Sequence, residues 1–190
     1  MSGRAKLFIL SGPSGAGKGT IVQRVLEERP EIRLSVSCTT RPARPMEVEG
    51  VHYHFVSERE FLERRDRGEF LEWAEVHGYL YGTPRKPVED YLSQGEDVIL
   101  EIDVQGAAEV KTAMPEARLI FIEPPSMQVL SQRLRKRSTE QEDALNRRLS
   151  DAYDELRKKE LFDGVIVNVE VEQAVAEVLA LMDRLKGRKN

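Results

Sequence analysis

The sequence predicts an α/β fold of three layers, in which helices cover both faces of a central parallel sheet. Short apolar runs alternate with segments of helical periodicity, and the runs are residues 7–10, 34–36, 98–102, 119–122 and 165–167. Continuous apolar runs are typical of strands buried on both faces of a parallel sheet. Alternation of such strands with helices favours right-handed βαβ crossovers. A glycine-rich turn between the first strand and the first helix is the third observation.

That turn reads SGPSGAGKGT at residues 11–20. Gly12 and Gly17 frame four residues and Lys18 follows, which is the G-x-x-x-x-G-K spacing of a phosphate-binding loop, or P-loop. Glycines let backbone N–H groups face phosphate oxygens, the following helix adds the positive end of its dipole, and Lys18 supplies a mobile charge for phosphoryl transfer. The alternative is a strand-to-helix turn that is merely rich in glycine. The predicted triphosphate site comprises Gly12, Pro13, Ser14, Gly15, Ala16, Gly17, Lys18, Gly19 and Thr20.

Magnesium is the expected cofactor of such a site, although one residue departs from the usual pattern. Gly19 follows Lys18 where many P-loops place a serine or threonine that binds Mg²⁺. We therefore expect nucleotide oxygens and water to hold most of the Mg²⁺ shell, because this ion retains water readily. Thr20 and Asp103 are candidates for contacts through water, and no direct protein ligand is predicted.

Bulk properties exclude several classes of protein. The chain has 190 residues and a formal charge of −4, which argues against a general nucleic-acid binder. No apolar run approaches the ~20 residues of a membrane helix, and the first residues lead directly into a strand, without a secretory signal. One cysteine, Cys38, fits a reducing compartment. We expect a cytoplasmic protein without nucleic-acid or membrane partners, either a monomer or a homodimer.

Two capping boxes mark the starts of helices. Ser57 with Glu60 precedes one helix, which Gly68 ends, and Thr139 with Glu142 precedes another. The helix after Glu142 is expected to bury one face formed by Leu145, Leu149, Ala152, Tyr153 and Leu156. The last helix repeats Val175, Val178, Leu179, Met182 and Leu185, which predicts core packing.

Residues 39–85 break the alternation with short strands, turns and one helix, rich in aromatic and polar residues. This pattern indicates an inserted lobe that carries substrate contacts and closes over the core. We divide the single unit into a core (residues 1–34, 96–125 and 160–190), a lobe (35–95) and a helical lid (126–159).

Charged residues supply three candidate groups beside the P-loop. Arg41 and Arg44, with Tyr53 and Tyr81, can form a second anion site for a phosphorylated acceptor; the alternative is a solvated arginine pair. Further along the chain, the lid arginines Arg133, Arg137 and Arg148 can stabilise a transition state, or belong to a solvated hairpin paired with acidic neighbours. Carboxylates at a strand's C-terminal end, Glu101 and Asp103, can contact a substrate hydroxyl or metal-bound water, or simply reach solvent.

The remaining candidates for chemistry are weak. His52, His54 and His77 show no metal-ligand spacing with the cysteine. Cys38 is expected in a polar loop, as a small residue rather than a nucleophile.

Eight motifs, taken in their order along the chain, resemble those of the guanylate kinase family, the ATP-dependent GMP kinases, and in particular its bacterial type. The motifs are SGPSGAGKGT (11–20), SVSCTTRPAR (35–44), GEFLEWA (68–74), YGTP (81–84), LEIDVQG (100–106), RLRKR (133–137), NRRL (146–149) and VIVN (165–168). The resemblance covers most of the chain and implies a P-loop kinase fold with a GMP-binding lobe and a lid. It implies transfer of a phosphoryl group from ATP to GMP with Mg²⁺, in purine nucleotide metabolism.

The resemblance also implies roles for individual residues. Arg41, Arg44, Tyr53 and Tyr81 would hold the GMP phosphate, Ser37, Glu72 and Thr83 would read guanine, and Glu101 and Asp103 would lie near acceptor and metal. The P-loop, Arg133, Arg137 and Asn168 would bind ATP, and the catalytic residues would be Lys18, Arg41, Arg137 and Arg148. The two oxygens of Glu72 suit guanine's N1–H and 2-amino donors, which adenine lacks as a pair.

Departures and rival functions remain open. Cys38 stands where serine is common, and Val169 follows Asn168 where aspartate is frequent; Arg148 is preferred to Arg147 by motif register. One rival is a P-loop kinase of another nucleotide or a sugar phosphate. The other is a non-catalytic guanylate-kinase-like binding module, in which the phosphate loop is typically degraded.

Overall fold

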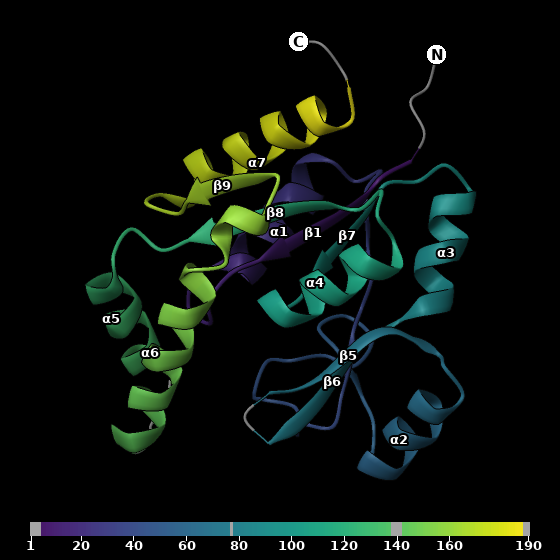
Figure 1. Cartoon of the computed structure of the whole chain (residues 1–190), viewed down its shortest axis with the longest axis horizontal. Coiled ribbons are helices and arrows are strands. Elements are labelled where there is room, and N and C mark those ends of the chain that lie inside the picture. The colour runs from purple at the N-terminus through teal and green to yellow at the C-terminus, as the bar shows by residue number, and fades with distance from the viewer. Residues whose placement is uncertain (1–4, 77, 138–141, 188–190) are drawn as a thin grey trace.

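The computed structural model describes residues 5–76, 78–137 and 142–187 (Figure 1). Its central sheet contains β1 (Leu7–Ser11), β2 (Arg33–Leu34), β7 (Val98–Glu101), β8 (Arg118–Glu123) and β9 (Gly164–Val167). The spatial order is β2-β7-β1-β8-β9, and every neighbouring pair is parallel. The predicted parallel sheet is therefore confirmed, with β2 one residue earlier and shorter than expected.

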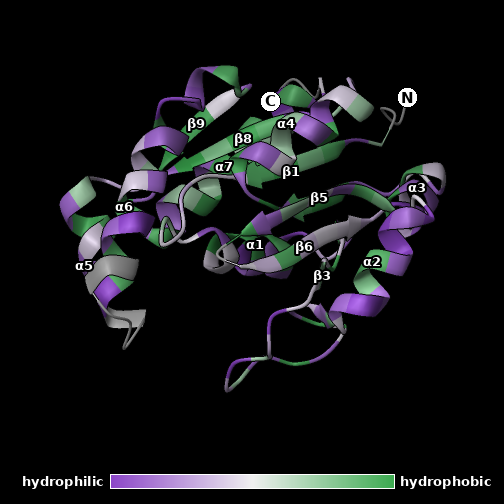
Figure 2. Cartoon of the chain, turned by 60° about the horizontal axis from the view of Figure 1, so that its bottom comes forward, coloured by the Kyte–Doolittle hydropathy of each residue, from purple (hydrophilic) through white to green (hydrophobic). Residues whose placement is uncertain are grey.

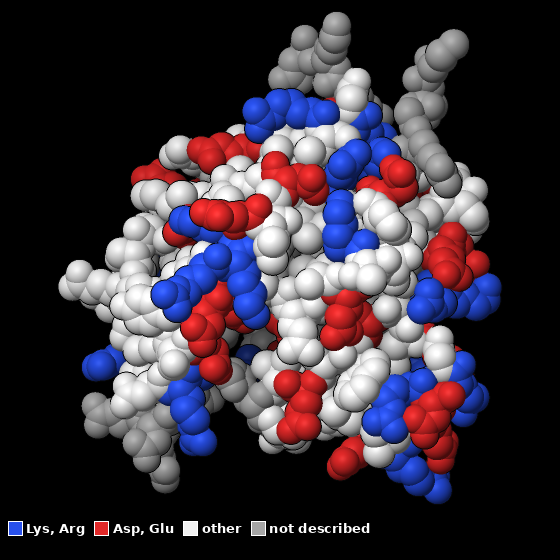
Figure 3. Space-filling model, viewed as in Figure 1, with Lys and Arg blue, Asp and Glu red and all other residues white. Residues whose placement is uncertain are grey.

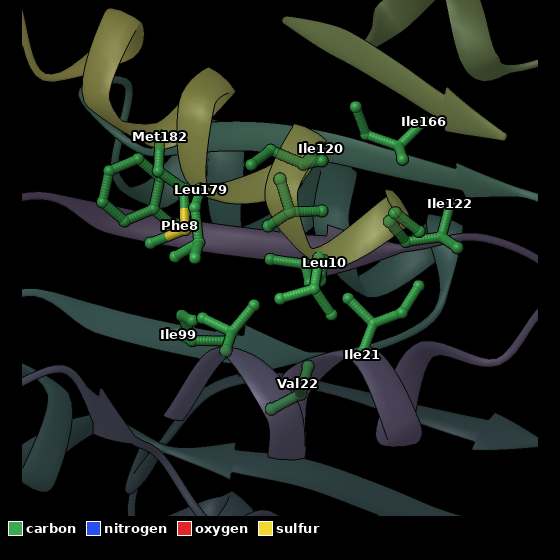
Figure 4. Close-up of a cluster of buried hydrophobic side chains, with 14 of the residues drawn as sticks. Phe8, Leu10, Ile21, Val22, Ile99, Ile120, Ile122, Ile166, Leu179 and Met182 are labelled. Carbon is green, nitrogen blue, oxygen red and sulfur yellow. The ribbon is translucent and has the colours of Figure 1, made fainter. Parts of the chain in front are cut away.

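Successive residues of the buried strands serve opposite faces of the sheet. Phe8 and Leu10 of β1 pack toward α1 (Lys18–Glu28) and α7 (Val171–Leu185), and Figure 4 shows them between Val22 and Leu179. Leu7 and Ile9 join the other cluster, under α3 (Arg85–Ser93) and α4 (Val104–Ala113). Each such fully buried side chain contributes about 2 kcal/mol, and the two clusters confirm the three-layer architecture.

Hydropathy follows the same layers. In Figure 2 the central strands β1 and β8 are largely green, whereas the helices around them carry both purple and green residues. Along α7, the predicted positions Val175, Val178, Leu179 and Met182 are buried, as expected for the inner face of an amphipathic helix. Among the described residues, no helix combines the length and apolar composition needed to cross a membrane.

The inserted segment forms a second sheet beside the first. Its strands are β3 (Cys38–Thr39), β4 (His54–Phe55), β5 (Phe70–Val76) and β6 (Tyr79–Pro84), in the order β4-β3-β6-β5. Under the sheet lies α2 (Glu58–Asp66), whose N-cap Ser57 accepts a hydrogen bond from the backbone N–H of Glu60 at 3.2 Å. Gly68 follows the helix with φ +71°. The N-cap at Ser57 and the helix end at Gly68 are thus confirmed.

The lobe has a small core of its own, and Cys38 belongs to it. Cys38 is buried with Phe61 and Phe70, whose rings stack 4.5 Å apart. The expected polar loop at Cys38 was wrong, because residues 38–39 form β3 in this sheet. By contrast, Val88 of α3, inside the range assigned to the lobe, packs with Leu7 and Ile9 under the central sheet.

The segment assigned to the lid is a helical hairpin of α5 (Met127–Arg137) and α6 (Glu142–Leu156), followed by the 3₁₀ turn η1 (Lys159–Leu161). Leu130, Leu134, Leu145 and Ala152 form its buried cluster. Tyr153 is 58% exposed, so its expected place on the apolar face was wrong; it follows the buried Ala152 directly and is rotated away from it. Thr139 of the second capping box lies outside the described residues.

Candidate functional site

The P-loop lies where β1 ends and α1 begins, against the backbone of β8 and the side chain of Asn168, which follows β9. Gly12 has φ +139°, and a Cβ there would lie 2.2 Å from the Ile122 carbonyl oxygen of β8. Gly17 has φ +97°, and a Cβ there would lie 2.3 Å from Nδ2 of Asn168. Side chains are excluded from both positions, so the glycine spacing has a structural reason as well as a functional one.

Lys18 starts α1 and folds back over the loop. Its Nζ donates hydrogen bonds to the carbonyl oxygens of Gly12 at 2.5 Å and Pro13 at 3.2 Å. The ammonium group therefore lies at the loop and at the positive end of the α1 dipole, the location in which a phosphate is attracted.

Residues from two distant segments meet at Ala16 of the loop. The Nδ2 of Asn168, directly after β9, donates to the Ala16 carbonyl at 2.7 Å. Arg133 of α5 donates from Nη1 to the same carbonyl and from Nη2 to the Asn168 carbonyl, each at 3.3 Å. The structure thus brings Arg133 and Asn168 together at the P-loop.

The hairpin α5–α6 also contacts Ser14 and Gly15 of the loop. Arg148 of α6 donates from Nη2 to the Ser14 hydroxyl at 2.8 Å. Beside it, Leu130 and Leu134 lie 3.0 Å from the position of a Cβ on Gly15. The side chain of Arg137 lies outside the described part of the chain.

The lobe supplies an arginine–tyrosine cluster. Arg41 is 8% exposed, and its Nε donates to the Tyr81 hydroxyl at 3.2 Å. Tyr53 lies edge-on to Tyr81, with ring centroids 5.9 Å apart, and beneath the Arg41 guanidinium at 5.5 Å. Burial raises the pKa of Tyr53 above its ordinary value, so this phenol stays protonated and can donate. Arg44 is exposed.

Sequence reasoning missed Glu47, which binds this cluster. Its carboxylate accepts hydrogen bonds from Nη1 and Nη2 of Arg41 and from the backbone N–H of Arg44. Burial opposes the ionisation of Glu47, but the hydrogen bonds and charges of Arg41 and Arg44 together outweigh it, so the pKa of Glu47 is lowered. The available signal in the sequence was Pro45, because proline favours a turn. A turn over residues 44–47 brings the carboxylate of Glu47, three residues after Arg44, back toward the arginines.

Glu72 and Thr83 face each other across β5 and β6. They are register partners, and the Thr83 hydroxyl donates to Oε1 of Glu72 at 2.6 Å. Glu72 is 6% exposed, and a Cβ on Gly106 of α4 would lie 2.7 Å from its Oε2. Burial raises the pKa of Glu72 to about 7, with Asp103 and Glu109 adding to the shift and Thr83 opposing it. The lobe therefore holds a buried carboxylate that is half protonated near neutral pH.

Ser37 and Cys38 occupy the neighbouring strand region of the lobe. The Ser37 carbonyl accepts a hydrogen bond from the His54 N–H at 2.8 Å, which ties the start of β3 to β4. Cys38 accepts a bond from Nη1 of Arg64 at 3.2 Å, and burial raises the pKa of its thiol. A buried thiol with a raised pKa is a poor nucleophile.

Two carboxylates lie at the C-terminal end of β7, at the edge where the P-loop lies: Glu101 is its last residue and Asp103 follows it. Glu101 is the register partner of Leu10, and a Cβ on Gly19 would lie 3.4 Å from its Oε2. After burial, the negative charge of Glu101 is the next cause of the raised pKa of Tyr53. Asp103 caps α4, since its Oδ1 accepts from the Gly106 N–H at 2.7 Å. This capping role was not foreseen.

Glu155 of α6 is a second residue that sequence reasoning missed. Burial raises its pKa to about 7, while the positive charge of Lys18 opposes the shift and Asp103 adds to it. Glu155 lies three residues after the buried Ala152, and an acid on the inner face of an amphipathic helix was the available signal. Among the described residues, no group of three or more His, Cys, Asp or Glu side chains forms a metal site.

Charge on the face shown in Figure 3 is mixed, and acidic and basic side chains lie next to one another rather than in patches of one sign. The face is hollowed between the α5–α6 hairpin and the lobe, as Figure 3 shows. In Figure 1 this hairpin and the lobe lie on the same side of the central sheet, below α4.

Comparison with known proteins agrees with this geometry. A family model described as guanylate kinase matches residues 4–185. A guanylate kinase of Symbiobacterium thermophilum is 51% identical over 182 residues, which cover 96% of this chain and 86% of that protein. One of Carboxydothermus hydrogenoformans is 44% identical over 188 residues, covering 98% and 92%. The crystal structure of guanylate kinase from Anaplasma phagocytophilum superposes with a TM-score of 0.80 at 36% identity, covering 98% of this chain and 88% of that one. Since the family model spans nearly the whole chain and these relatives match over most of their length, the chain belongs to the guanylate kinase family.

Proposed function

We propose that the chain transfers the γ-phosphoryl group of ATP to GMP, giving ADP and GDP. The observation that carries this proposal is the buried Glu72–Thr83 pair in a lobe beside a P-loop. Ionised Glu72 offers two oxygens to the N1–H and 2-amino donors of guanine, and the Thr83 hydroxyl holds one of them at 2.6 Å. A base without these donors would leave the buried carboxylate unpaired, which gives discrimination.

In this proposal ATP binds at the P-loop. The backbone N–H groups of the P-loop, other than at Pro13, which has none, face the phosphates, and Lys18 moves from the loop carbonyls to the transferring group. Arg133 and Asn168 both donate to the Ala16 carbonyl of the loop, which supports assigning them to the nucleoside end of ATP. We assign Arg148 and Arg137 to the stabilisation of charge at the β- and γ-phosphates. The hydrogen bond from Arg148 Nη2 to the Ser14 hydroxyl, at 2.8 Å, supports the assignment of Arg148.

Arg41, Arg44, Tyr53 and Tyr81 are assigned to the acceptor phosphate. The Arg41–Tyr81 bond supports this assignment, because it presents a guanidinium and a phenol in one buried site. Ser37 is assigned to guanine beside Glu72. Closure of the lobe (35–95) and the lid (126–159) over the core would exclude water from the transfer.

The residues near Gly19 fit a bound Mg²⁺. The carboxylate of Glu101 lies beside the first turn of α1, next to the position where other P-loops carry a hydroxyl, and carboxylate oxygens are ligands that Mg²⁺ accepts. Glu101 and Asp103 would hold its water molecules, with Thr20 as a further candidate. When bound, the ion neutralises charge on the β- and γ-phosphates. The proposal also assigns the protein to the cytoplasm and to purine nucleotide metabolism. It would act there as a monomer or a homodimer.

The first test is ADP formation from Mg-ATP with GMP, AMP, CMP, UMP or no acceptor in parallel. We expect strong turnover with GMP alone. Turnover with another nucleotide or a sugar phosphate would replace the guanine assignment, and no acceptor-dependent turnover would favour a binding module.

Replacing Glu72 with glutamine is expected to weaken GMP use by about 1–3 kcal/mol, which is up to about a hundredfold in kcat/KM. The amide keeps the shape but offers a donor where guanine also has one. The measurement is the ratio of kcat/KM for GMP to that for AMP. An unchanged ratio would remove Glu72 from guanine recognition.

Proton linkage gives a second prediction for Glu72. Folding raises the pKa of Glu72 from 4.5 to about 7 in the nucleotide-free protein. Between these two pH values the folded chain keeps a proton that the unfolded chain loses. The contribution of Glu72 to stability therefore falls as pH rises through that window. GMP needs the ionised carboxylate, so its affinity should rise about tenfold from about pH 6 to about pH 8. The GMP phosphate also titrates near pH 6, and Glu72→Gln, titrated alongside, isolates the contribution of Glu72. Parallel pH profiles would contradict the linkage.

A further inference from the structure

We propose that Glu47 is a positioning residue for the acceptor phosphate. It binds the end of the Arg41 guanidinium, formed by Nη1 and Nη2, and leaves the side edge, formed by Nε and Nη2, for the ligand. This inference rests on the proposed role of Arg41 in binding the acceptor phosphate. Its basis is the hydrogen bonding of Arg41 and the turn that carries Glu47.

Glu47 and Arg41 form a two-pronged ion pair. Oε2 of Glu47 accepts from Nη1 at 3.0 Å, and Oε1 accepts from Nη2 at 2.9 Å. The two side chains are 16% and 9% exposed, so the pair is protected from water. Such parallel bonds set the plane and the direction of the guanidinium, which a single contact cannot do.

The remaining bonds of Arg41 define which edge is left for a ligand. Nη1 also donates to the Pro42 carbonyl at 2.7 Å, and Nε donates to the Tyr81 hydroxyl at 3.2 Å. A guanidinium carries five N–H groups, and among the described residues these bonds leave one N–H on Nη2. That N–H shares the side edge with Nε and Tyr81. A phosphate oxygen approaching there meets the Nη2–H and the Tyr81 O–H together.

A tight turn brings the carboxylate to this position. The N–H of Glu47 donates to the Arg44 carbonyl at 3.0 Å, which closes a turn over residues 44–47 with Pro45 second and Met46 third. Met46 has φ +77° and is 91% exposed. A positive φ at the third position is the geometry of a type II turn, which favours glycine. The chain holds a methionine in this unfavourable conformation, and the result is Glu47 accepting the Arg44 N–H at 2.7 Å.

Charge alone would give Glu47 the opposite effect. A carboxylate beside an acceptor phosphate repels it, so removing a purely electrostatic group would strengthen GMP binding. Removing a positioning group instead weakens it, because Arg41 loses its fixed orientation. The sign of the change in GMP affinity therefore separates the two roles.

The test compares Glu47→Ala, Glu47→Gln and Glu49→Ala with the unsubstituted protein, measuring kcat and the KM values for GMP and ATP. We expect Glu47→Ala to raise the GMP KM about tenfold and to leave the ATP KM within about twofold, with Glu47→Gln intermediate because it keeps one oxygen. Glu49 is the matched control: it lies in the same segment but accepts from the Phe55 N–H at 2.8 Å and contacts His54 rather than Arg41. Its substitution should leave the GMP KM unchanged.

A double-substitution cycle shows whether Glu47 acts through Arg41. The Arg41→Ala, Glu47→Ala pair should be no worse for GMP than Arg41→Ala alone, because the orientation of an absent guanidinium has no effect. Additive losses would overturn the inference. So would an unchanged or lowered GMP KM in Glu47→Ala, or equal rises in both KM values. If Glu47→Ala does not fold, Glu47→Gln decides by the same signs.

Failure of the proposed function has a different signature. The unsubstituted protein would then form no ADP in response to GMP, and both proposals would fall. If only the present inference is wrong, GMP-dependent turnover of the unsubstituted protein and its loss in Arg41→Ala remain, while Glu47→Ala behaves like Glu49→Ala.

Discussion

Replacing Lys18 with alanine is expected to lower kcat for ADP formation by about a thousandfold or more, with little change in stability. Phosphoryl transfer depends on positive charge that follows the moving group, and comparable donors and cations contribute two to five orders of magnitude in other enzymes. The bonds lost in the nucleotide-free protein are those from Nζ to the carbonyls of Gly12 and Pro13. Their loss lowers the free energy of unfolding by about 1 kcal/mol, so turnover should fall steeply while the temperature of thermal unfolding changes little.

Lys86→Ala is the matched control for this substitution. Lys86 is a lysine of α3 whose side chain is 84% exposed and pairs with Asp90 one turn along the helix. Such a surface pair contributes little to stability, and the site lies away from the P-loop, so kcat should be unchanged. Near-normal turnover of Lys18→Ala would remove the P-loop lysine from the chemistry.

The second large effect is on folding. Gly12→Ala is expected to destabilise the protein by about 3 kcal/mol or more, which would lower Tm by roughly 6–12 °C for a chain of this size. A Cβ at this position would lie 2.2 Å from the Ile122 carbonyl oxygen, and φ is +139°. The clashing atom belongs to the backbone of β8, which is held in the sheet between β1 and β9, so it cannot move aside as a flexible side chain could.

Gly19→Ala provides the comparison within the same loop region. Gly19 lies in the first turn of α1, and a Cβ there would meet Glu101 Oε2 at 3.4 Å, an ordinary contact. Alanine also favours a helix over glycine by about 1 kcal/mol, so Tm should be unchanged or raised. If thermal denaturation shows equal Tm values for Gly12→Ala and Gly19→Ala, the close approach of the loop to β8 is wrong.

Local signals explain why much of this site could be predicted. The spacing of Gly12, Gly17 and Lys18 specifies a loop through backbone conformation, which neighbouring residues determine. The Ser57–Glu60 cap and the apolar face of α7 are also local patterns, and both are confirmed. The prediction for Tyr153 was wrong because a helical face inferred from spacing is uncertain by about one position, and one position along a helix rotates a side chain by about 100°.

The chemistry of individual side chains could be predicted less well. Asp103 was identified as a site residue, yet its Oδ1 also caps α4. Glu47 and Glu155 were missed because the role of a carboxylate depends on the groups that surround it, and those groups come together only when the chain folds. Glu47 is six residues from Arg41, but only the turn at Met46 aims it at the guanidinium.

The sequence by itself determined the three-layer architecture, the P-loop and the lobe's inventory of arginine, tyrosine and glutamate, since periodicity, glycine spacing and residue type are properties of short segments. The tertiary structure alone decided that Arg133 and Asn168 meet at Ala16, that Gly12 lies against Ile122 and that burial brings the pKa of Glu72 to about 7. These are relations between segments many residues apart. They arise from the packing of strands and helices against one another, because burial and distance exist only after the chain has closed its core.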